Sequence, residues 1–365
     1  MAAGPQDLLA PHRAESHGDR SMAEPASAAA PTAAAPTAAA SVVASAAAPT
    51  VAAPATPGLL RRALPWLIGL GILVVLGMRL PFDAFRDAVG QGPHLLLAAV
   101  NLAIMVAVLC TDSLSSWVAL RAVRIRRPLL HIAAVRGATY LLIVINYAVG
   151  QGAFGYYLHR TGAPTLRAVG STLFLIGTSL ATLLLITTVA WATHAADPGH
   201  QAMWFTLVGG CAALAGYLLV IAVAPRFLTR LQLFAPLFEA GLRGHTAAIL
   251  ARLPHLMVVV LGHWLALVAW GIPVPFSAGL MYAPAVVFAS VLPFAPGGLG
   301  TTQAAFVFFF SDLAVGATAE ARSAAVLAFA ITHFVYGVVA LAAVGLACTP
   351  LARRIDGAMA PRKGR

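Results

Sequence analysis

A stretch rich in glycine and proline, residues 292–303 (LPFAPGGLGTTQ), separates two apolar runs, 277–291 and 304–310. Each run is shorter than the roughly 20 apolar residues that a helix needs to cross a bilayer. The prolines and glycines break a helix and let the backbone turn sharply, and such backbone at membrane depth must be buried or line a wet cavity. We therefore expect a re-entrant or broken helix pair, as at transporter binding sites. The alternative is an ordinary tight loop at the membrane surface.

The rest of the chain is also strongly apolar. Hydrophobic residues make up 60% of the 365 and charged residues only 10%, which indicates an all-α polytopic membrane bundle. The net charge of +11 could suggest nucleic acid, but the arginines cluster beside apolar segments. Orientation in the membrane explains that pattern better, and no nucleic-acid partner is expected.

Composition divides the chain into three parts. Residues 1–57 are rich in alanine and proline and lack the large apolar side chains that would offset the entropy of folding, so we expect a disordered cytoplasmic tail. Residues 58–352 form the transmembrane domain, and residues 353–365 form a basic cytoplasmic tail.

Six apolar segments are expected to span the membrane: 64–80, 95–120, 166–191, 203–224, 254–270 and 324–348. Basic loops stay in the cytoplasm, which places both termini and the arginine-rich loop 121–127 inside. Residues 234–251 have apolar positions at helical spacing and could form an interfacial helix.

The segment 129–165 is predicted to form a second re-entrant pair. If residues 129–149 crossed the membrane fully, every later loop would break the charge rule, because Arg160 and Arg167 would then lie outside. We expect a hairpin with its turn somewhere near Asn146 to Gly155. Each half of the chain would then hold one glycine-interrupted segment, which suggests a weak inverted repeat.

The motif between the two apolar runs resembles a known signature. Residues 292–310 are similar to the second signature of the flippase-like membrane domain of lysylphosphatidylglycerol synthases and of related stand-alone membrane proteins. The matching residues are Pro296, Gly297, Gly298, Leu299 and Gly300. The position of the family's glutamate is Gln303 here.

A looser resemblance to the family's first signature is carried by Asn146, Gly150, Gly152 and Arg160, without its acidic residue. The similarity covers roughly residues 59–351. It implies a membrane domain that handles lipid headgroups. No segment could hold the soluble aminoacyl-transferase domain, so a complete synthase is not expected.

The candidate site combines a buried cation with the glycine-rich turn. A helix that starts at Thr301 presents free N–H groups to an anion, although Thr301 and Thr302 could merely cap it. Arg136 lies in an apolar segment, where it could hold a lipid phosphate or simply pair with Asp112 to join two helices. The candidate substrate-binding residues are Arg136, Asn146, Gln151, Arg160, Gly297, Gly298, Gly300, Thr301, Thr302 and Gln303.

The sequence therefore predicts a protein of the bacterial inner membrane that translocates or binds an anionic lipid through a polar groove. The alternative is a membrane-embedded accessory subunit or transferase of a lipid- or glycan-modifying pathway, which would have a membrane enzyme as partner. A third interpretation is a scaffold without a substrate. No catalytic constellation, cofactor site or metal site is expected, and the sequence gives no signal for an oligomeric state.

Overall fold

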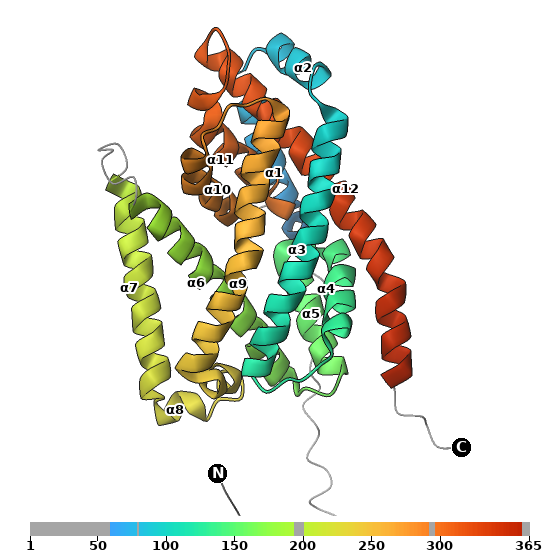
Figure 1. Ribbon diagram of the computed structural model, residues 1–365, viewed down its shortest axis with the longest axis vertical. Coiled ribbons are helices and arrows are strands. Elements are labelled where there is room, and N and C mark those ends of the chain that lie inside the picture. Colours follow the sequence, from blue (N-terminus) through green and yellow to red (C-terminus); the bar gives the residue numbers. More distant parts are fainter. Residues whose placement is uncertain (1–58, 79, 193–200, 292–295, 360–365) are drawn as a thin grey trace, which may run out of the picture. The chain divides into compact units, whose positions relative to one another are not determined.

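The computed structural model describes residues 59–78, 80–192, 201–291 and 296–359 (Figure 1). The predicted tail 1–57 lies outside these ranges. The described residues form helices and no strand, which confirms the all-α prediction. In order, the helices are α1 (Leu59–Met78), α2 (Phe82–Gly90), α3 (His94–Ala122), α4 (Leu129–Ile143), α5 (Tyr147–Arg160), α6 (Thr165–Ala192), α7 (Gln201–Val223), α8 (Arg226–Thr229), α9 (Ala235–Trp270), α10 (Phe276–Val291), the 3₁₀ turn η2 (Pro296–Gly298), α11 (Thr301–Phe310), the 3₁₀ turn η3 (Ser311–Leu313) and α12 (Ala319–Met359).

Among the described residues, five helices are long and apolar enough to cross a membrane: α3, α6, α7, α9 and α12. They correspond to five of the six predicted spans. The remaining span, 64–80, corresponds to α1, whose residues pass the same test together with α2 across a bend of 104°. The chain is a multi-pass membrane protein.

Helix α9 differs from the sequence prediction. The segment 234–251, expected to lie at the interface, is instead continuous with the span that follows it. Gly241 interrupts the helical geometry (φ 56°, ψ −174°), and the helix then continues past Pro254 to Trp270. The lost hydrogen bond at a helix-internal proline is tolerated in membrane helices, so Pro254 was the wrong place to begin a span.

The carboxyl end also differs from the prediction. Helix α12 continues to Met359, so residues 353–359 of the predicted tail are helical. Residues 360–365 lie outside the described part.

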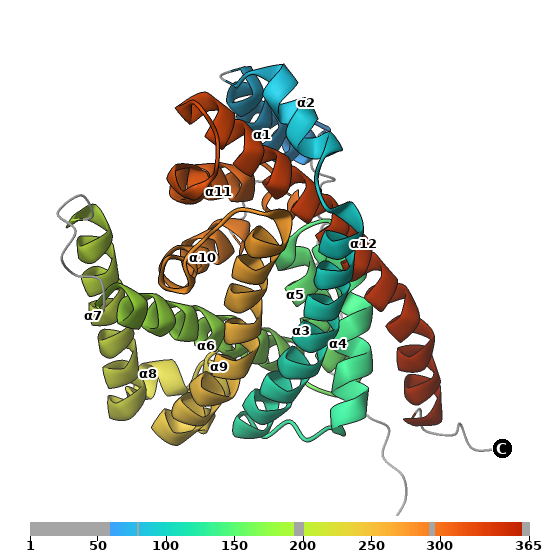
Figure 2. The ribbon, with the colours of Figure 1, turned by 45° about the horizontal axis from the view of Figure 1, so that its top comes forward.

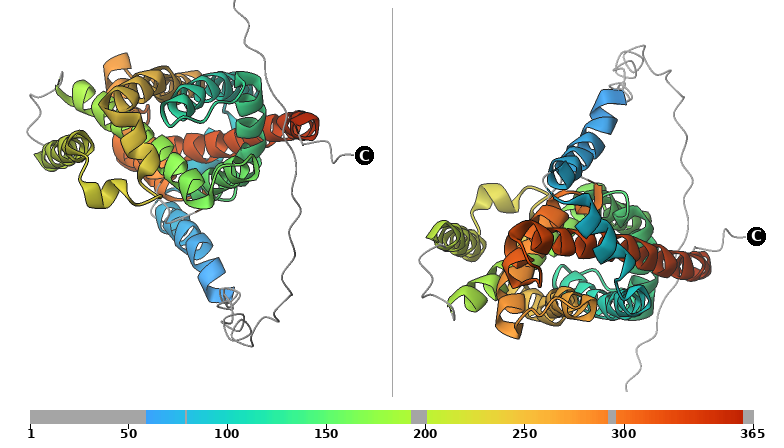
Figure 3. Two further views of the ribbon diagram at one scale, coloured as in Figure 1. Left: turned by 90° about the horizontal axis from the view of Figure 1, so that it is seen from below. Right: turned by 90° about the horizontal axis from the view of Figure 1, so that it is seen from above.

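The first predicted hairpin consists of α4 and α5, which pack against each other between α3, α6 and α12 (Figure 3). At its base, a guanidinium N–H of Arg127 donates to the carbonyl oxygen of Thr161, so the hairpin begins and ends at the same end of the bundle. The turn lies at residues 144–146, where Asn146 adopts an extended conformation. The turn thus lies at the start of the range predicted near Asn146 to Gly155, and the rest of that range belongs to the helix Tyr147–Arg160.

The second hairpin consists of α10, η2 and α11 and enters the bundle from the opposite end (Figures 1 and 2). Three glycines with positive φ make its turn: Gly297 (57°), Gly298 (75°) and Gly300 (84°). A Cβ on Gly297 would lie 3.6 Å from the carbonyl oxygen of Val144, so the two tips meet inside the bundle.

Candidate functional site

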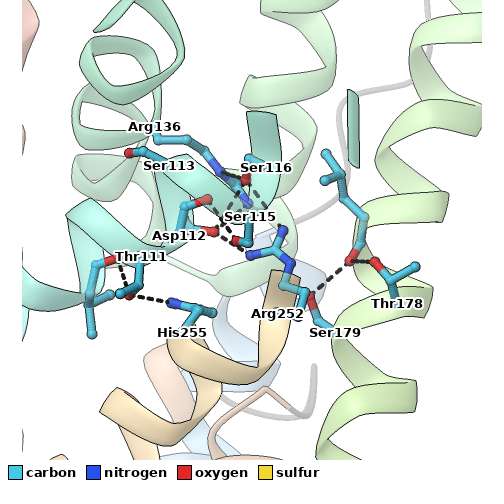
Figure 4. Close-up of polar contacts among 12 residues, drawn as sticks. Thr111, Asp112, Ser113, Ser115, Ser116, Arg136, Thr178, Ser179, Arg252 and His255 are labelled. Carbon is cyan, nitrogen blue, oxygen red and sulfur yellow. Dashed lines mark hydrogen bonds and ion pairs between the residues drawn. The ribbon is translucent and has the colours of Figure 1, made fainter. Parts of the chain in front are cut away.

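Asp112 of α3 lies at the centre of a buried ionic network (Figure 4). Its Oδ1 accepts a hydrogen bond of 3.1 Å from Nη2 of Arg136 on α4 and one of 2.5 Å from Nη1 of Arg252 on α9. The side chains are only 7%, 3% and 2% exposed, respectively. The predicted contact between Asp112 and Arg136 is present, but Asp112 is shared with a second arginine.

Every nitrogen of the Arg136 guanidinium has a partner. Besides Asp112, Nε donates to the Ser116 hydroxyl at 3.1 Å, and Nη1 donates to Oε1 of Gln151 at 3.1 Å. The guanidinium also lies over the Phe154 ring, with 4.5 Å from Cζ to the ring centroid. These contacts come from α3 and α5, so Arg136 joins the hairpin to a membrane-spanning helix.

Ser116 connects the two arginines. Its Oγ accepts from Nη2 of Arg252 at 3.3 Å as well as from Arg136, and it donates to Asp112 at 3.3 Å. Asp112 and Ser116 are four residues apart and therefore share one face of α3. The Nε of Arg252 is buried and has no hydrogen-bond partner within the described ranges.

Two further side chains complete this end of the network. The Tyr140 hydroxyl, one turn after Arg136, donates to Oδ2 of Asp112 at 3.2 Å. The Nδ1 of His255, nearly one turn after Arg252, lies 3.4 Å from the Thr111 hydroxyl. Helices α3, α4, α5 and α9 thus each contribute polar side chains to one place in the membrane-spanning bundle.

A cavity of about 330 Å³ extends from this network to the second hairpin. Arg136 and Gln151 line it from the first hairpin, and Gly297 and Thr302 line it from the second. Its remaining polar lining includes Asn101, Asp112, Tyr140, Tyr147, Ser179, Arg252, His255, His263, Ser290 and His333. The volume lies within the roughly 300–1,000 Å³ that is typical of small-molecule sites.

Six predicted site residues do not line this cavity: Asn146, Arg160, Gly298, Gly300, Thr301 and Gln303. Arg160 is exposed at the base of the first hairpin. Gly298 and Gly300 pack closely, because a Cβ on Gly298 would lie 2.8 Å from Cα of Ser290 and one on Gly300 would lie 2.5 Å from the carbonyl oxygen of Gly69.

The other three hold helix ends. Asn146 caps α5 by accepting from the Ala148 N–H at 2.8 Å, and Gln303 caps α11 by accepting from the Gly300 N–H at 2.6 Å. The Thr301 hydroxyl donates to the carbonyl oxygens of Ala289 and Gly298. The Thr301 hydroxyl therefore ties the start of α11 to α10 and to the turn instead of capping the helix, and the buried Thr302 hydroxyl has no partner within the described ranges.

Arg252 is the main residue that sequence reasoning missed. The predicted span 254–270 begins two residues after Arg252 and therefore leaves it outside the membrane. The signal that could have revealed it is the spacing of Arg252 and His255, which places two polar side chains on one face of an apolar helix.

The two guanidinium groups and one carboxylate leave one net positive charge at the cavity wall, with the histidines neutral. An unbalanced charge in a membrane-spanning bundle is costly unless something else neutralises it. Among the described residues, no group of three or more His, Cys, Asp or Glu side chains could hold a metal ion.

Fold and site together define a helical multi-pass membrane protein with a charged internal cavity. Comparison with protein-family models and with curated proteins finds no match to this chain.

Proposed function

We propose that this protein binds the headgroup of an anionic membrane lipid in the cavity between the two hairpins and carries it across the bilayer. The observation that carries the proposal is the single net positive charge formed by Asp112, Arg136 and Arg252. An anionic headgroup would neutralise it, and guanidinium groups suit phosphate oxygens because they can donate paired hydrogen bonds.

The remaining lining suits a lipid as well. Apolar side chains from several helices surround the polar network, including Leu180, Leu183, Val287 and Leu341. A headgroup could contact the network while acyl chains remain against apolar surface. The tips of both hairpins meet at this cavity, which is the arrangement by which inverted-repeat transporters form a central site.

The location and family are part of the same proposal. We place the protein in a bacterial inner membrane, as a member of the flippase-like family that its PGGLG motif resembles. One end of the bundle carries Arg121, Arg124, Arg126, Arg127, Arg160, Arg167, Arg353 and Arg354, whereas the other end carries, among the described residues, Arg86 and Arg322 beside Asp83, Asp87, Asp312 and Glu320. The positive-inside rule places the arginine-rich end, with both chain termini, in the cytoplasm.

Transport is tested by reconstituting the full chain into liposomes with fluorescent phosphatidylglycerol or phosphatidylcholine and following their movement between leaflets with a membrane-impermeant quencher. We expect faster movement of the anionic lipid. Arg136→Gln removes the excess charge but leaves Asp112 paired with Arg252, so this variant should fold and lose the anionic preference by about tenfold, as expected for one lost charge-assisted contact.

Arg86→Gln is the matched control, because Arg86 is exposed on α2 and forms its ion pairs within the described residues with Asp83 and Asp87, away from the cavity. It should transport as the unmodified protein does. If the network only joined helices, Arg136→Gln would instead lower the yield of folded protein and leave the relative transport rates of the two lipids unchanged. Equal movement of both lipids by the unmodified protein contradicts the proposal.

Orientation is tested by cysteine labelling in a chain whose native Cys110, Cys211 and Cys348 are replaced. A membrane-impermeant maleimide should label a cysteine at exposed Ala317 from outside intact cells. A cysteine at Arg160 should react only after permeabilisation. The reverse pattern would contradict the proposed orientation.

A further inference from the structure

A second, separate pocket lies where α3 and α5 end and α4 and α6 begin. Its volume is about 260 Å³, and four arginines line it: Arg124, Arg126, Arg127 and Arg167. None of them lines the central cavity. Because the pocket lies at helix ends, its ligand would come from the membrane surface or the adjoining solution.

Two of the arginines are held in place. Arg167 makes a two-pronged ion pair with Glu239, at 2.8 and 2.5 Å, and also donates to the carbonyl oxygen of Val123 at 3.1 Å. Arg127 donates to the Thr161 carbonyl oxygen. By contrast, Arg124 and Arg126 are exposed, and neither guanidinium group forms a hydrogen bond or ion pair with the described part of the chain. Four arginines against one carboxylate leave three positive charges.

The same helix-ending motif occurs twice at this pocket. At the end of α5, Gly162 takes the left-handed conformation (φ 104°), and the Ala163 N–H donates to the Leu158 carbonyl at 3.2 Å. At the end of α3, the Ile125 N–H donates to the Leu120 carbonyl at 2.8 Å, and Arg124 takes the left-handed position (φ 63°). Glycine is the residue that adopts this conformation at the lowest cost.

Arg124 is therefore unfavourable for the turn in which it lies. Sparsely populated backbone conformations of this kind concentrate at functional sites. Orientation alone does not require an arginine at this position, because Arg121, Arg126 and Arg127 already supply positive charge to the same loop. Nearby, the first N–H groups of α4 and α6 add partial positive charge, and α4 has no side-chain cap. The ends of α3 and α5 offset part of that charge.

We propose that this pocket binds a phosphate group, held by the free guanidinium groups of Arg124 and Arg126 between the fixed arginines Arg127 and Arg167. The phosphate belongs either to a lipid headgroup at the membrane surface or to a soluble phosphate compound. In both cases paired guanidinium donors recognise the phosphate oxygens. This inference does not depend on lipid transport through the central cavity.

The test measures the thermal unfolding midpoint of the full chain in neutral detergent while one of three probes is titrated: inorganic phosphate, short-chain phosphatidylglycerol or short-chain phosphatidylcholine. A bound ligand raises the midpoint in a concentration-dependent way, which yields its affinity. The unmodified chain should respond to phosphatidylglycerol more strongly than to phosphatidylcholine. A response to inorganic phosphate as well assigns the site to free phosphate, and a response to the lipid alone assigns it to the headgroup.

Arg124→Gly separates folding from binding. It should raise the ligand-free midpoint by about 2 °C, because glycine relieves the turn, yet weaken the probe affinity about tenfold. The double variant Arg124→Gly with Arg126→Gln should weaken it further. Ala224→Gly is the matched control, because Ala224 also has a positive φ (48°) but lies after α7. It should raise the midpoint and leave the probe affinity unchanged. Unchanged affinity in the double variant, or no response of the unmodified chain to any anionic probe, overturns the proposal.

Discussion

The two hairpins break their helices in different ways. The first hairpin turns at residues 144–146 without any glycine, and Asn146 stops one helix and caps the next from an extended conformation (φ −168°). The second turns on Gly297, Gly298 and Gly300, all with positive φ, and relies on Gln303 to cap α11. The first turn depends on a side-chain cap. The second depends on its own cap and also on glycines, which have no side chain.

Two glycines of the first hairpin, Gly150 and Gly155, serve packing instead. A Cβ on Gly150 would lie 2.2 Å from the Ile143 side chain, and one on Gly155 would lie 2.7 Å from the Thr172 hydroxyl. Small residues let membrane helices approach closely, and here they allow α5 to lie against α4 and α6. A glycine-rich segment in a membrane protein can therefore mark either a turn or a tight helix contact.

The hairpins also differ in charge. The first carries Arg136, whose partners include Asp112 and Gln151, whereas the second faces the cavity with Gly297 and the neutral Thr302. The first hairpin should therefore be sensitive to changes of charge, and the second should be sensitive to changes of shape.

The largest effect should come from Gly298→Val in the second turn. Valine at φ 75° is strained, and its Cβ would approach Cα of Ser290 to 2.8 Å. We expect a loss of more than about 4 kcal/mol of folding free energy, seen as the disappearance of monodisperse protein in detergent. The matched change in the first hairpin is Gly152→Ala, since Gly152 is helical with open space around it. It should be neutral or stabilising by roughly 0.5–1 kcal/mol. Equal tolerance of both changes would refute the shape-dependent second turn.

The next effect should come from Asp112→Asn. This change leaves two buried guanidinium groups without a carboxylate, which we expect to cost about 3–5 kcal/mol. Thermal unfolding in detergent measures it. Thr302→Val, at the other end of the cavity, should change stability by less than about 1 kcal/mol, because its hydroxyl has no partner among the described residues. A larger loss at Thr302 than at Asp112 would reverse the assignment of charge to the first hairpin.

The smallest effects should come from the two caps. Gln303→Ala leaves the buried Gly300 N–H without an acceptor and should cost roughly 1–3 kcal/mol. Asn146→Ala removes a cap near the surface of the first hairpin and should cost about 1 kcal/mol. Differences in the unfolding midpoint would rank them, and a more damaging Asn146 change would mean that the glycine turn does not depend on its cap.

The sequence predicted the membrane class, five long spans and both hairpins, because length, hydropathy and arginine position act through a few strong physical constraints. It could not narrow the first turn beyond the range near Asn146 to Gly155, because glycine favours both sharp turns and close helix contacts. It also missed Arg252, since a one-dimensional pattern shows that an arginine lies near a proline but not which face of a 36-residue helix it occupies. The partnership of Asp112 with two arginines depends on the packing of α9 against α3, which no local pattern encodes.

Under the proposed function, the excess of one arginine over Asp112 would make lipid binding depend on the net charge of the headgroup. A monoanionic headgroup would make the site electrically neutral, whereas a dianionic one would leave it negative and a zwitterionic one would leave it positive. Burial in a low-dielectric bundle strengthens such charge differences, so under the proposed function the cavity would prefer monoanionic lipids to dianionic or zwitterionic ones.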